Sequence, residues 1–245
     1  MLASAAALTF SQLGHLALAS PAAYEPPSVQ KAWQAFLAHV PTILLIWVAW
    51  ALISGVGFVV SLGITAVGIA LTSGVAGSDA TASIADLVGA IVQLPFVVFS
   101  SLVGVLFVAV PALHYATGET IGVEQAFSTL FQRPWRYLLA GLLFSVVGVL
   151  GLILCIVPGV AVSLVGPVYV NRIFNSDTPV LQAFTGSFQA VYGSSKGWEF
   201  VGIQVLVFLV LVVVTVCTCG LGALVAVPVS TFYLQNAAYH KGVLS

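Results

Sequence analysis

The segment from Val123 to Arg172 decides the fold, and it reads VEQAFSTLFQRPWRYLLAGLLFSVVGVLGLILCIVPGVAVSLVGPVYVNR. Its stretch from Tyr137 to Asn171 contains no Lys, Arg, Asp or Glu. A single helix of about 35 residues would be about 52 Å long, whereas the hydrocarbon core of a bilayer is about 30 Å thick. Pro158 removes a backbone donor, and Gly159 can adopt a left-handed conformation. We therefore predict a membrane hairpin whose turn is formed by Pro158 and Gly159.

Composition places the whole chain in the same class. Of its 245 residues, 60% are hydrophobic and only 5% are charged, whereas soluble domains carry about 25% charged residues. Long unbroken apolar runs exclude a transmembrane barrel, whose strands alternate apolar and polar residues. Six Lys and Arg residues with a net charge of −1 cannot build a surface that follows nucleic-acid phosphates. The composition predicts a polytopic α-helical membrane protein that binds no nucleic acid.

The tripeptide Gln-Ala-Phe occurs three times, at 34–36, 125–127 and 182–184. Each copy lies in an amphipathic segment that precedes two apolar runs, which indicates an internal repeat. We predict an all-α integral membrane protein with six transmembrane helices in three repeated hairpins. A cytoplasmic-face amphipathic helix precedes each hairpin. Outside the 137–171 hairpin, the expected spans are 42–71, 87–113, 200–216 and 223–238.

The chain is expected to divide at the Pro-rich stretch before Val29. Residues 1–28 are interpreted as an apolar N-terminal segment and a connector, and residues 29–245 as a single membrane domain. A cleaved secretory signal is the alternative for the start, although it lacks the positive charges typical of one. Within the domain, the repeat units cover about 29–118, 119–176 and 177–245.

Charge placement predicts the orientation. Six spans put every Lys and Arg on one side of the membrane and leave the hairpin tips without a base. Lys and Arg are enriched in cytoplasmic loops. We therefore expect both termini to be cytoplasmic.

The motifs RPWRYLLAGLL and LGLILCIVPGV, residues 133–143 and 150–160, resemble those of the YciC-like proteins. They are also similar to the membrane domains of glycerophosphoryl diester phosphodiesterases. The resemblance covers about 123–239 and implies a bacterial protein of the inner membrane or a thylakoid-type membrane. It implies no catalytic residues, and the chain lacks the acid- and histidine-rich phosphodiesterase domain.

Small residues recur along two predicted spans. Gly57, Ser61 and Thr65 repeat at four-residue spacing, and Gly141 and Ser145 do the same. Such stripes let helices approach closely in lipid, so these residues are predicted to pack helices together.

A basic and aromatic cluster precedes the second hairpin and consists of Arg133, Trp135, Arg136 and Tyr137. One interpretation is membrane anchoring, with the rings at headgroup depth and the guanidinium groups reaching phosphates. The other is a docking face for anionic lipid or a partner protein.

The three cysteines fall at predicted hairpin tips. Cys155 could form a disulfide with Cys217 or Cys219 in an oxidising compartment, or all three could be buried thiols acting as small apolar residues. Three cysteines without a nearby His form an incomplete metal set.

His39 and His114 are expected to be solvated interfacial residues, with haem or chlorophyll ligation as the alternative.

Polar chemistry is sparse inside the predicted spans, which contain no acidic residue. Gln93, Gln204 and Asn171 are expected to form interhelical hydrogen bonds rather than a substrate site.

We expect no enzyme activity and no cofactor. The leading hypothesis is a scaffold, assembly or accessory protein that contacts lipids and joins a respiratory or photosynthetic membrane complex or a homo-oligomer. The alternative is a transport or lipid-handling protein with a cavity between hairpins, because Gly and Pro interrupt the short spans.

Overall fold

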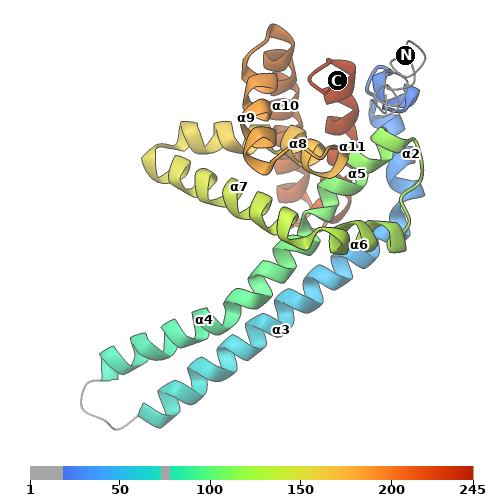
Figure 1. Cartoon of the computed structure of the whole chain (residues 1–245). Coiled ribbons are helices and arrows are strands. Elements are labelled where there is room, and N and C mark those ends of the chain that lie inside the picture. The colour runs from blue at the N-terminus through green and yellow to red at the C-terminus, as the bar shows by residue number, and fades with distance from the viewer. Residues whose placement is uncertain (1–18, 73–77, 245) are drawn as a thin grey trace, which may run out of the picture. The chain divides into compact units, whose positions relative to one another are not determined.

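The computed structural model describes residues 19–72 and 78–244, and every regular element in these residues is a helix (Figure 1). Their order begins with the short 3-10 helix η1 (Pro21–Tyr24), α2 (Val29–Ala38), α3 (Val40–Thr72), α4 (Ser78–Gly104) and α5 (Leu106–Thr117). It continues with α6 (Val123–Gln132), α7 (Pro134–Leu154), α8 (Ile156–Asn175), α9 (Val180–Tyr192), α10 (Ser195–Cys217) and α11 (Ala223–His240). The prediction of an all-helical chain is confirmed for these residues.

Five helical stretches in the described residues are long and apolar enough to cross a membrane. They are Val40–Ala70, Asp86–Thr117, Pro134–Leu154, Ile156–Asn175 and Ser195–Cys217. The second stretch joins α4 and α5, which are separated at Val105. Helix α11, where a sixth span is predicted, is not among them, because the polar residues Gln235, Asn236 and His240 lower the hydropathy of its C-terminal half.

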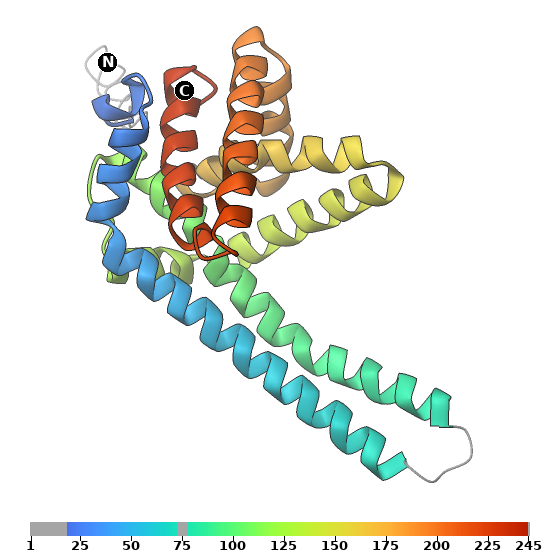
Figure 2. The ribbon, with the colours of Figure 1, turned by 180° about the vertical axis from the view of Figure 1, so that it is seen from behind.

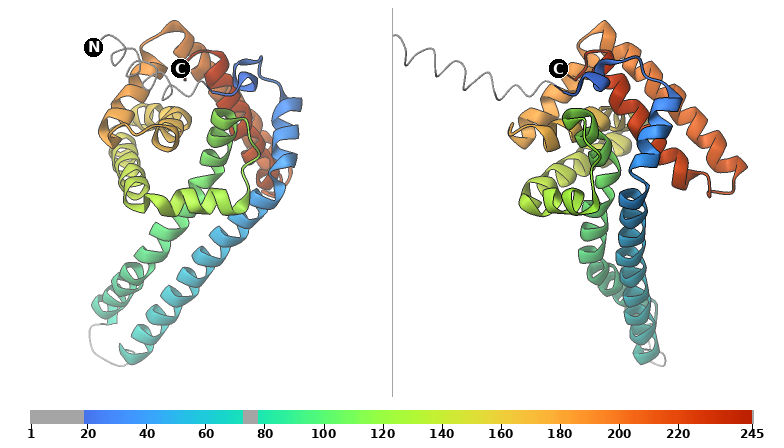
Figure 3. Two further views of the ribbon diagram at one scale, coloured as in Figure 1. Left: turned by 45° about the vertical axis from the view of Figure 1, so that its right-hand side comes forward. Right: turned by 90° about the vertical axis from the view of Figure 1, so that its right-hand side faces the viewer.

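The chain forms two compact units, and each is described by itself. One contains, among the described residues, 40–72, 78–107 and 122–145, and is built on the antiparallel pair α3 and α4, which remain side by side in both views of Figure 3. Trp47 packs against Phe107 near the end of this pair, with ring centroids 4.5 Å apart. Helix α6 contacts α3 within the same unit.

The other unit contains, among the described residues, 19–39, 108–121 and 146–244. Helix α11 packs against η1, α2, α8 and α10, and Figure 2 shows it beside α2 and α10. Its residues from Gln235 to Tyr239 are all buried. The core of this unit therefore lies around the C-terminal half of α11.

The three Gln-Ala-Phe copies lie on α2, α6 and α9, and each of these short helices is followed by a long apolar helix. In every copy the Gln is exposed and the Phe is buried or half-buried. Ser28 is the N-cap of α2, because its Oγ accepts a hydrogen bond from Lys31 N at 3.2 Å. An N-cap oxygen satisfies one of the free amides in the first turn of a helix.

The predicted position of the second hairpin turn is wrong by three residues. Helix α7 ends at Leu154 and α8 begins at Ile156, so the chain reverses at Cys155, whose extended backbone has φ −174° and ψ 152°. Pro158 and Gly159 lie in the first turn of α8, where a proline costs no intrahelical hydrogen bond. A Cβ added to Gly159 would collide with the side chain of Leu152 on α7 and lie 2.9 Å from the Leu152 amide nitrogen. The glycine at 159 therefore permits close helix approach rather than a left-handed turn.

Candidate functional site

The buried polar side chains of the unit built around α11 form the candidate site. Gln235 and Asn236 are 0% and 2% exposed and lie next to each other on α11. Tyr239 follows one turn later and is also buried. Burying a polar group without a hydrogen bond is costly, so the partners of these groups decide what the cluster can do.

Asn171 of α8 joins two of these residues in one network. Its Nδ2 donates to Gln235 Oε1 at 3.0 Å and to the Tyr239 hydroxyl at 3.1 Å. Gln235 Nε2 in turn donates to the Pro167 carbonyl at 2.9 Å. The donors of both amides are engaged within the protein, so the network fastens α8 to α11. The predicted interhelical role of Asn171 is confirmed.

Asn236 binds the backbone of the N-terminal segment. Its Nδ2 donates to the carbonyls of Ala23 at 2.8 Å, Glu25 at 3.1 Å and Ala22 at 3.4 Å. The nearby His240 Nδ1 lies 3.0 Å from the Tyr24 carbonyl. Residues 22–25 are therefore part of the folded unit around α11, which corrects their interpretation as a connector outside the membrane domain.

His39 and His114 also come together, with ring centroids 4.9 Å apart. His39 is 0% exposed, with Nδ1 2.7 Å from the Ala35 carbonyl and Nε2 accepting from Ile121 N at 3.0 Å. A carbonyl can only accept and an amide can only donate, so His39 is the neutral tautomer with its proton on Nδ1. This corrects the expectation of a solvated His39, and neither of its ring nitrogens is free to bind haem iron or chlorophyll magnesium.

Burial is the largest influence on the titration of His39. It lowers the pKa of His39 from its ordinary value of 6.5, while the hydrogen bond to Ala35 opposes this and the charge of His114 adds to it. The imidazole is therefore held neutral in the folded protein. The described residues contain no group of three or more His, Cys, Asp or Glu side chains placed to hold a metal ion.

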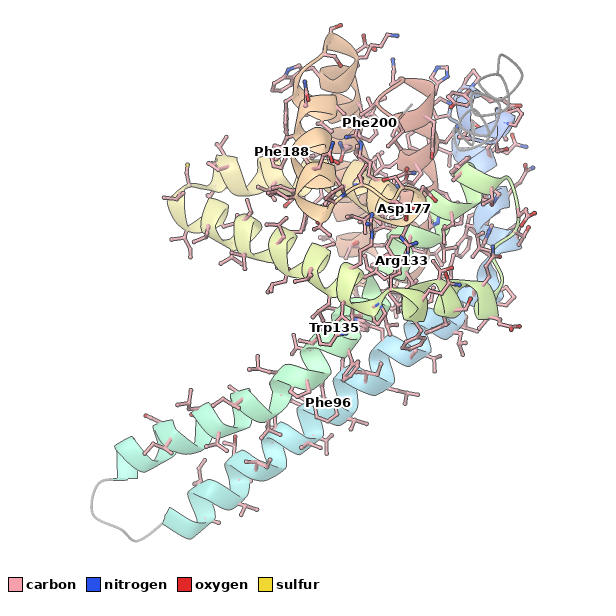
Figure 4. The ribbon with its side chains drawn as sticks, in the orientation of Figure 1. Phe96, Arg133, Trp135, Asp177, Phe188 and Phe200 are labelled. Carbon is pink, nitrogen blue, oxygen red and sulfur yellow. The ribbon has the colours of Figure 1, made fainter. Side chains whose placement is uncertain are left out.

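Gly57, Ser61 and Thr65 all face α4. A Cβ on Gly57 would collide with the side chain of Phe96, which lies between the two helices in Figure 4. Ser61 Oγ donates to the Gly89 carbonyl at 3.0 Å, and the Thr65 hydroxyl lies where a Cβ of Gly89 would be. The stripe lets α3 and α4 approach closely through small residues on both helices.

Gly141 and Ser145 occupy a different setting on α7. Both are exposed, and nothing lies within 4 Å of the position that a Cβ of Gly141 would take. The structure therefore leaves this second stripe open.

The basic and aromatic cluster divides between exposed and buried side chains. Trp135, labelled in Figure 4, is 75% exposed, whereas Tyr137 is only 8% exposed. Arg133 is exposed and Arg136 is half-buried, and both have interaction partners in the structure. Helix α7 begins at Pro134, so the four residues cover the end of α6 and the first turn of α7.

Cys155, Cys217 and Cys219 are free thiols with exposed side chains. Cys155 lies in the turn between α7 and α8, and the other two lie where α10 leads into α11; Figures 1 and 2 show these turns well apart. The interpretation of the cysteines as buried apolar residues is therefore wrong, and these three described thiols form no bridge with one another.

Two of the polar residues predicted to join helices behave differently from Asn171. Gln204 is buried, and its Nε2 has no hydrogen-bond partner among the described residues. Gln93 on α4 is half-buried. Gln204 lies on the same face of α10 as Gly197, Phe200 and Val201, which are the other buried residues of that helix.

The sequence interpretation missed Gln235, Asn236 and Tyr239. The signal was present, because an adjacent Gln-Asn pair interrupts the apolar stretch that was predicted to be the sixth span. Polar residues in such positions are expensive in lipid and face the interior of a helix bundle. That rule predicts the burial of these side chains, although it does not identify their partners.

No protein family, curated protein or solved structure matches the chain.

Proposed function

We propose that the protein is a non-catalytic integral membrane scaffold or assembly factor that acts through helix–helix and lipid contacts, as an accessory subunit of a larger membrane complex. The observation that carries this proposal is the open small-residue stripe of Gly141 and Ser145 on α7, a helix long and apolar enough to span a membrane. Small residues on a lipid-facing helix let a second helix approach its backbone.

The buried polar network supports the same proposal. The amides of Asn171, Gln235 and Asn236 all bind groups of the chain itself. Fully satisfied networks of this kind rigidify a fold and specify its packing. The polar groups at the centre of the unit around α11 therefore serve architecture rather than substrate chemistry.

We also infer a topology of six spans in three hairpins, with both termini in the cytoplasm of a bacterial inner membrane or on the equivalent side of a thylakoid-type membrane. Helix α11 would be the sixth span. It packs against η1, α2, α8 and α10, its residues from Gln235 to Tyr239 are buried, and intramembrane polar groups are tolerated where protein encloses them.

The natural cysteines test this topology without a new mutation. In intact cells or spheroplasts, a membrane-impermeant maleimide should label Cys155, Cys217 and Cys219, because all three are exposed at turns assigned to the non-cytoplasmic side. The control is Lys196→Cys, made in a variant with all native cysteines changed to Ser. That control should react only after the membrane is permeabilised. Its labelling in intact cells would refute the orientation.

The scaffold proposal is tested by purification from native membranes in mild detergent, followed by native gel sizing and mass spectrometry. A partner should copurify at fixed stoichiometry, and Gly141→Leu should release it by filling the open stripe. The matched control is Gly202→Leu on α10, where a Cβ also meets open space. Migration as a single self-contained species that neither change affects would contradict the proposal.

A lipid-handling protein is the second candidate, favoured by a shallow apolar depression between α3 and α4. It has a volume of about 320 Å³ and is lined by Leu52, Ile53, Val56, Phe96 and Phe99. An acyl chain fits such a lining, because only apolar side chains contact it. Val56→Trp should fill the depression and reduce the lipid that copurifies, as measured by mass spectrometry. Unchanged lipid content would remove this candidate.

A further inference from the structure

Arg172 lies in the last turn of α8, and its positive charge is not balanced by a neighbouring group in the described part of the fold. It is half-buried, and its guanidinium has no hydrogen-bond or ion-pair partner among residues 19–72 and 78–244. Lys31, by contrast, pairs with Glu25 at 2.7 Å, and Lys241 pairs with Glu199. A partly desolvated charge without a partner is costly, which raises the question of what Arg172 binds.

Gly186 of α9 makes room for the guanidinium. A Cβ built on Gly186 would collide with Arg172 Nη1. The planar group therefore lies against the bare backbone of α9, in a notch that exists only because residue 186 has no side chain.

The helices on both sides of this notch are held together by packed rings. Tyr169, one turn before Arg172 on α8, contacts Phe184 of α9 with ring centroids 5.4 Å apart. Phe184 in turn contacts Phe188 at 5.0 Å. Asn171 anchors the same turn of α8 to α11. The guanidinium is thus presented by a packed α8–α9 pair, seen in Figure 4 around the labelled Phe188.

The position along the helix limits the ligand chemistry. Arg172 lies near the end of Ile156–Asn175, one of the stretches able to cross a membrane, so its guanidinium is expected at headgroup depth. Guanidinium presents five donors in a rigid fork that matches the oxygens of a phosphate group. Basic pockets between membrane helices are known to bind anionic headgroups.

We propose that Arg172, seated over Gly186, binds the phosphate group of an anionic phospholipid at the membrane end of the α8–α9 pair. This goes beyond the proposed scaffold function, because it assigns a defined lipid site to a residue outside the basic and aromatic cluster at 133–137. It also stands if the scaffold function fails, since it requires no protein partner.

The test uses the full-length protein, purified and delipidated in detergent and titrated with dioctanoyl phosphatidylglycerol. The readout is the apparent Kd, obtained from the rise in unfolding temperature with lipid concentration. Dioctanoyl phosphatidylcholine, whose phosphate charge is balanced by choline, and inorganic phosphate are titrated in parallel. Arg172→Gln should weaken phosphatidylglycerol binding about tenfold or more, because a charge-assisted pair is lost.

Gly186→Ala provides a second variant that keeps the charge of Arg172 but fills its notch. It should weaken phosphatidylglycerol binding in the same direction, since the guanidinium must move. The matched charge control is Lys31→Gln, which removes one positive charge from an exposed ion pair and should leave the affinity unchanged.

Three results would overturn the proposal. Arg172→Gln could lower the unfolding temperature equally with and without lipid while the Kd stays the same, which would make Arg172 purely structural. Phosphatidylcholine could bind as tightly as phosphatidylglycerol, which would remove the requirement for an anionic headgroup. Inorganic phosphate could stabilise the protein as strongly as the lipid, which would assign the residue to a soluble ligand instead.

Discussion

Replacing Asn236 with Ala should strongly destabilise the unit around α11. The Asn236 side chain donates to the carbonyls of Ala23 and Glu25 at 2.8 and 3.1 Å, and Ala23 is fully buried. The variant would leave these acceptors without their donor. One buried group left unsatisfied costs about 1–3 kcal/mol. Because Glu25 is exposed and its carbonyl can bind water instead, the loss from the Ala23 carbonyl predicts a destabilisation of about 1–3 kcal/mol.

The assay is unfolding in detergent, combined with limited proteolysis of the N-terminal segment. The Asn236→Ala variant should unfold at lower denaturant and be cleaved faster near residues 19–28. The matched control is Asn175→Ala, which removes a single 3.2 Å bond from an exposed side chain to the Ala112 carbonyl. That change should cost about 1 kcal/mol or less. If the two variants are equally stable, or if Asn236→Ala lies within about 0.5 kcal/mol of the wild type, the assigned role of Asn236 is refuted.

Two further predictions concern the histidine pair and the α3–α4 contact. Because burial lowers the pKa of His39 below 6.5, the unfolded chain takes up a proton there before the folded chain does, so stability should fall as the pH drops below about 6.5. His39→Gln should flatten this dependence in unfolding measured between about pH 7.5 and 5, and an unchanged slope would contradict the assignment. Gly57→Leu should separate α3 from α4 at Phe96 and cost about 1–3 kcal/mol, as measured by unfolding in detergent. Gly63→Leu, whose Cβ meets open space, should have little effect, and equal losses for the two variants would show that the clash at Phe96 is not the cause.

Periodicity and composition were sufficient for much of the architecture. The apolar runs predicted the helices because a chain without charges over such lengths must satisfy its backbone internally in lipid. The amphipathic pattern around Gln34, Gln125 and Gln182 predicted three short helices, and each of these side chains is exposed. The small residues at 57, 61 and 65 lie on one face of α3 by helical geometry alone.

Other features depended on which helices meet. The turn at Cys155 was placed three residues too late, because Pro and Gly serve the first turn of a helix as well as they serve a loop. Gly141 and Ser145 have the same spacing as the stripe on α3 but remain open, since spacing defines a face and not its partner. The role assigned to Gly159 changed for the same reason, because its neighbour Gly151 belongs to another helix.

The sequence by itself determined that this is a helical protein with long apolar spans and short amphipathic helices, because both properties follow from local patterns of side chains. Only the tertiary structure decided that Asn236 donates to the backbone carbonyls of residues 22, 23 and 25, that His39 is a neutral acceptor for Ile121, and that Arg172 lies over Gly186. These contacts join residues far apart in the chain or on different helices. Their energies depend on distances and desolvation that no local pattern encodes, so they become visible only when the helices are packed.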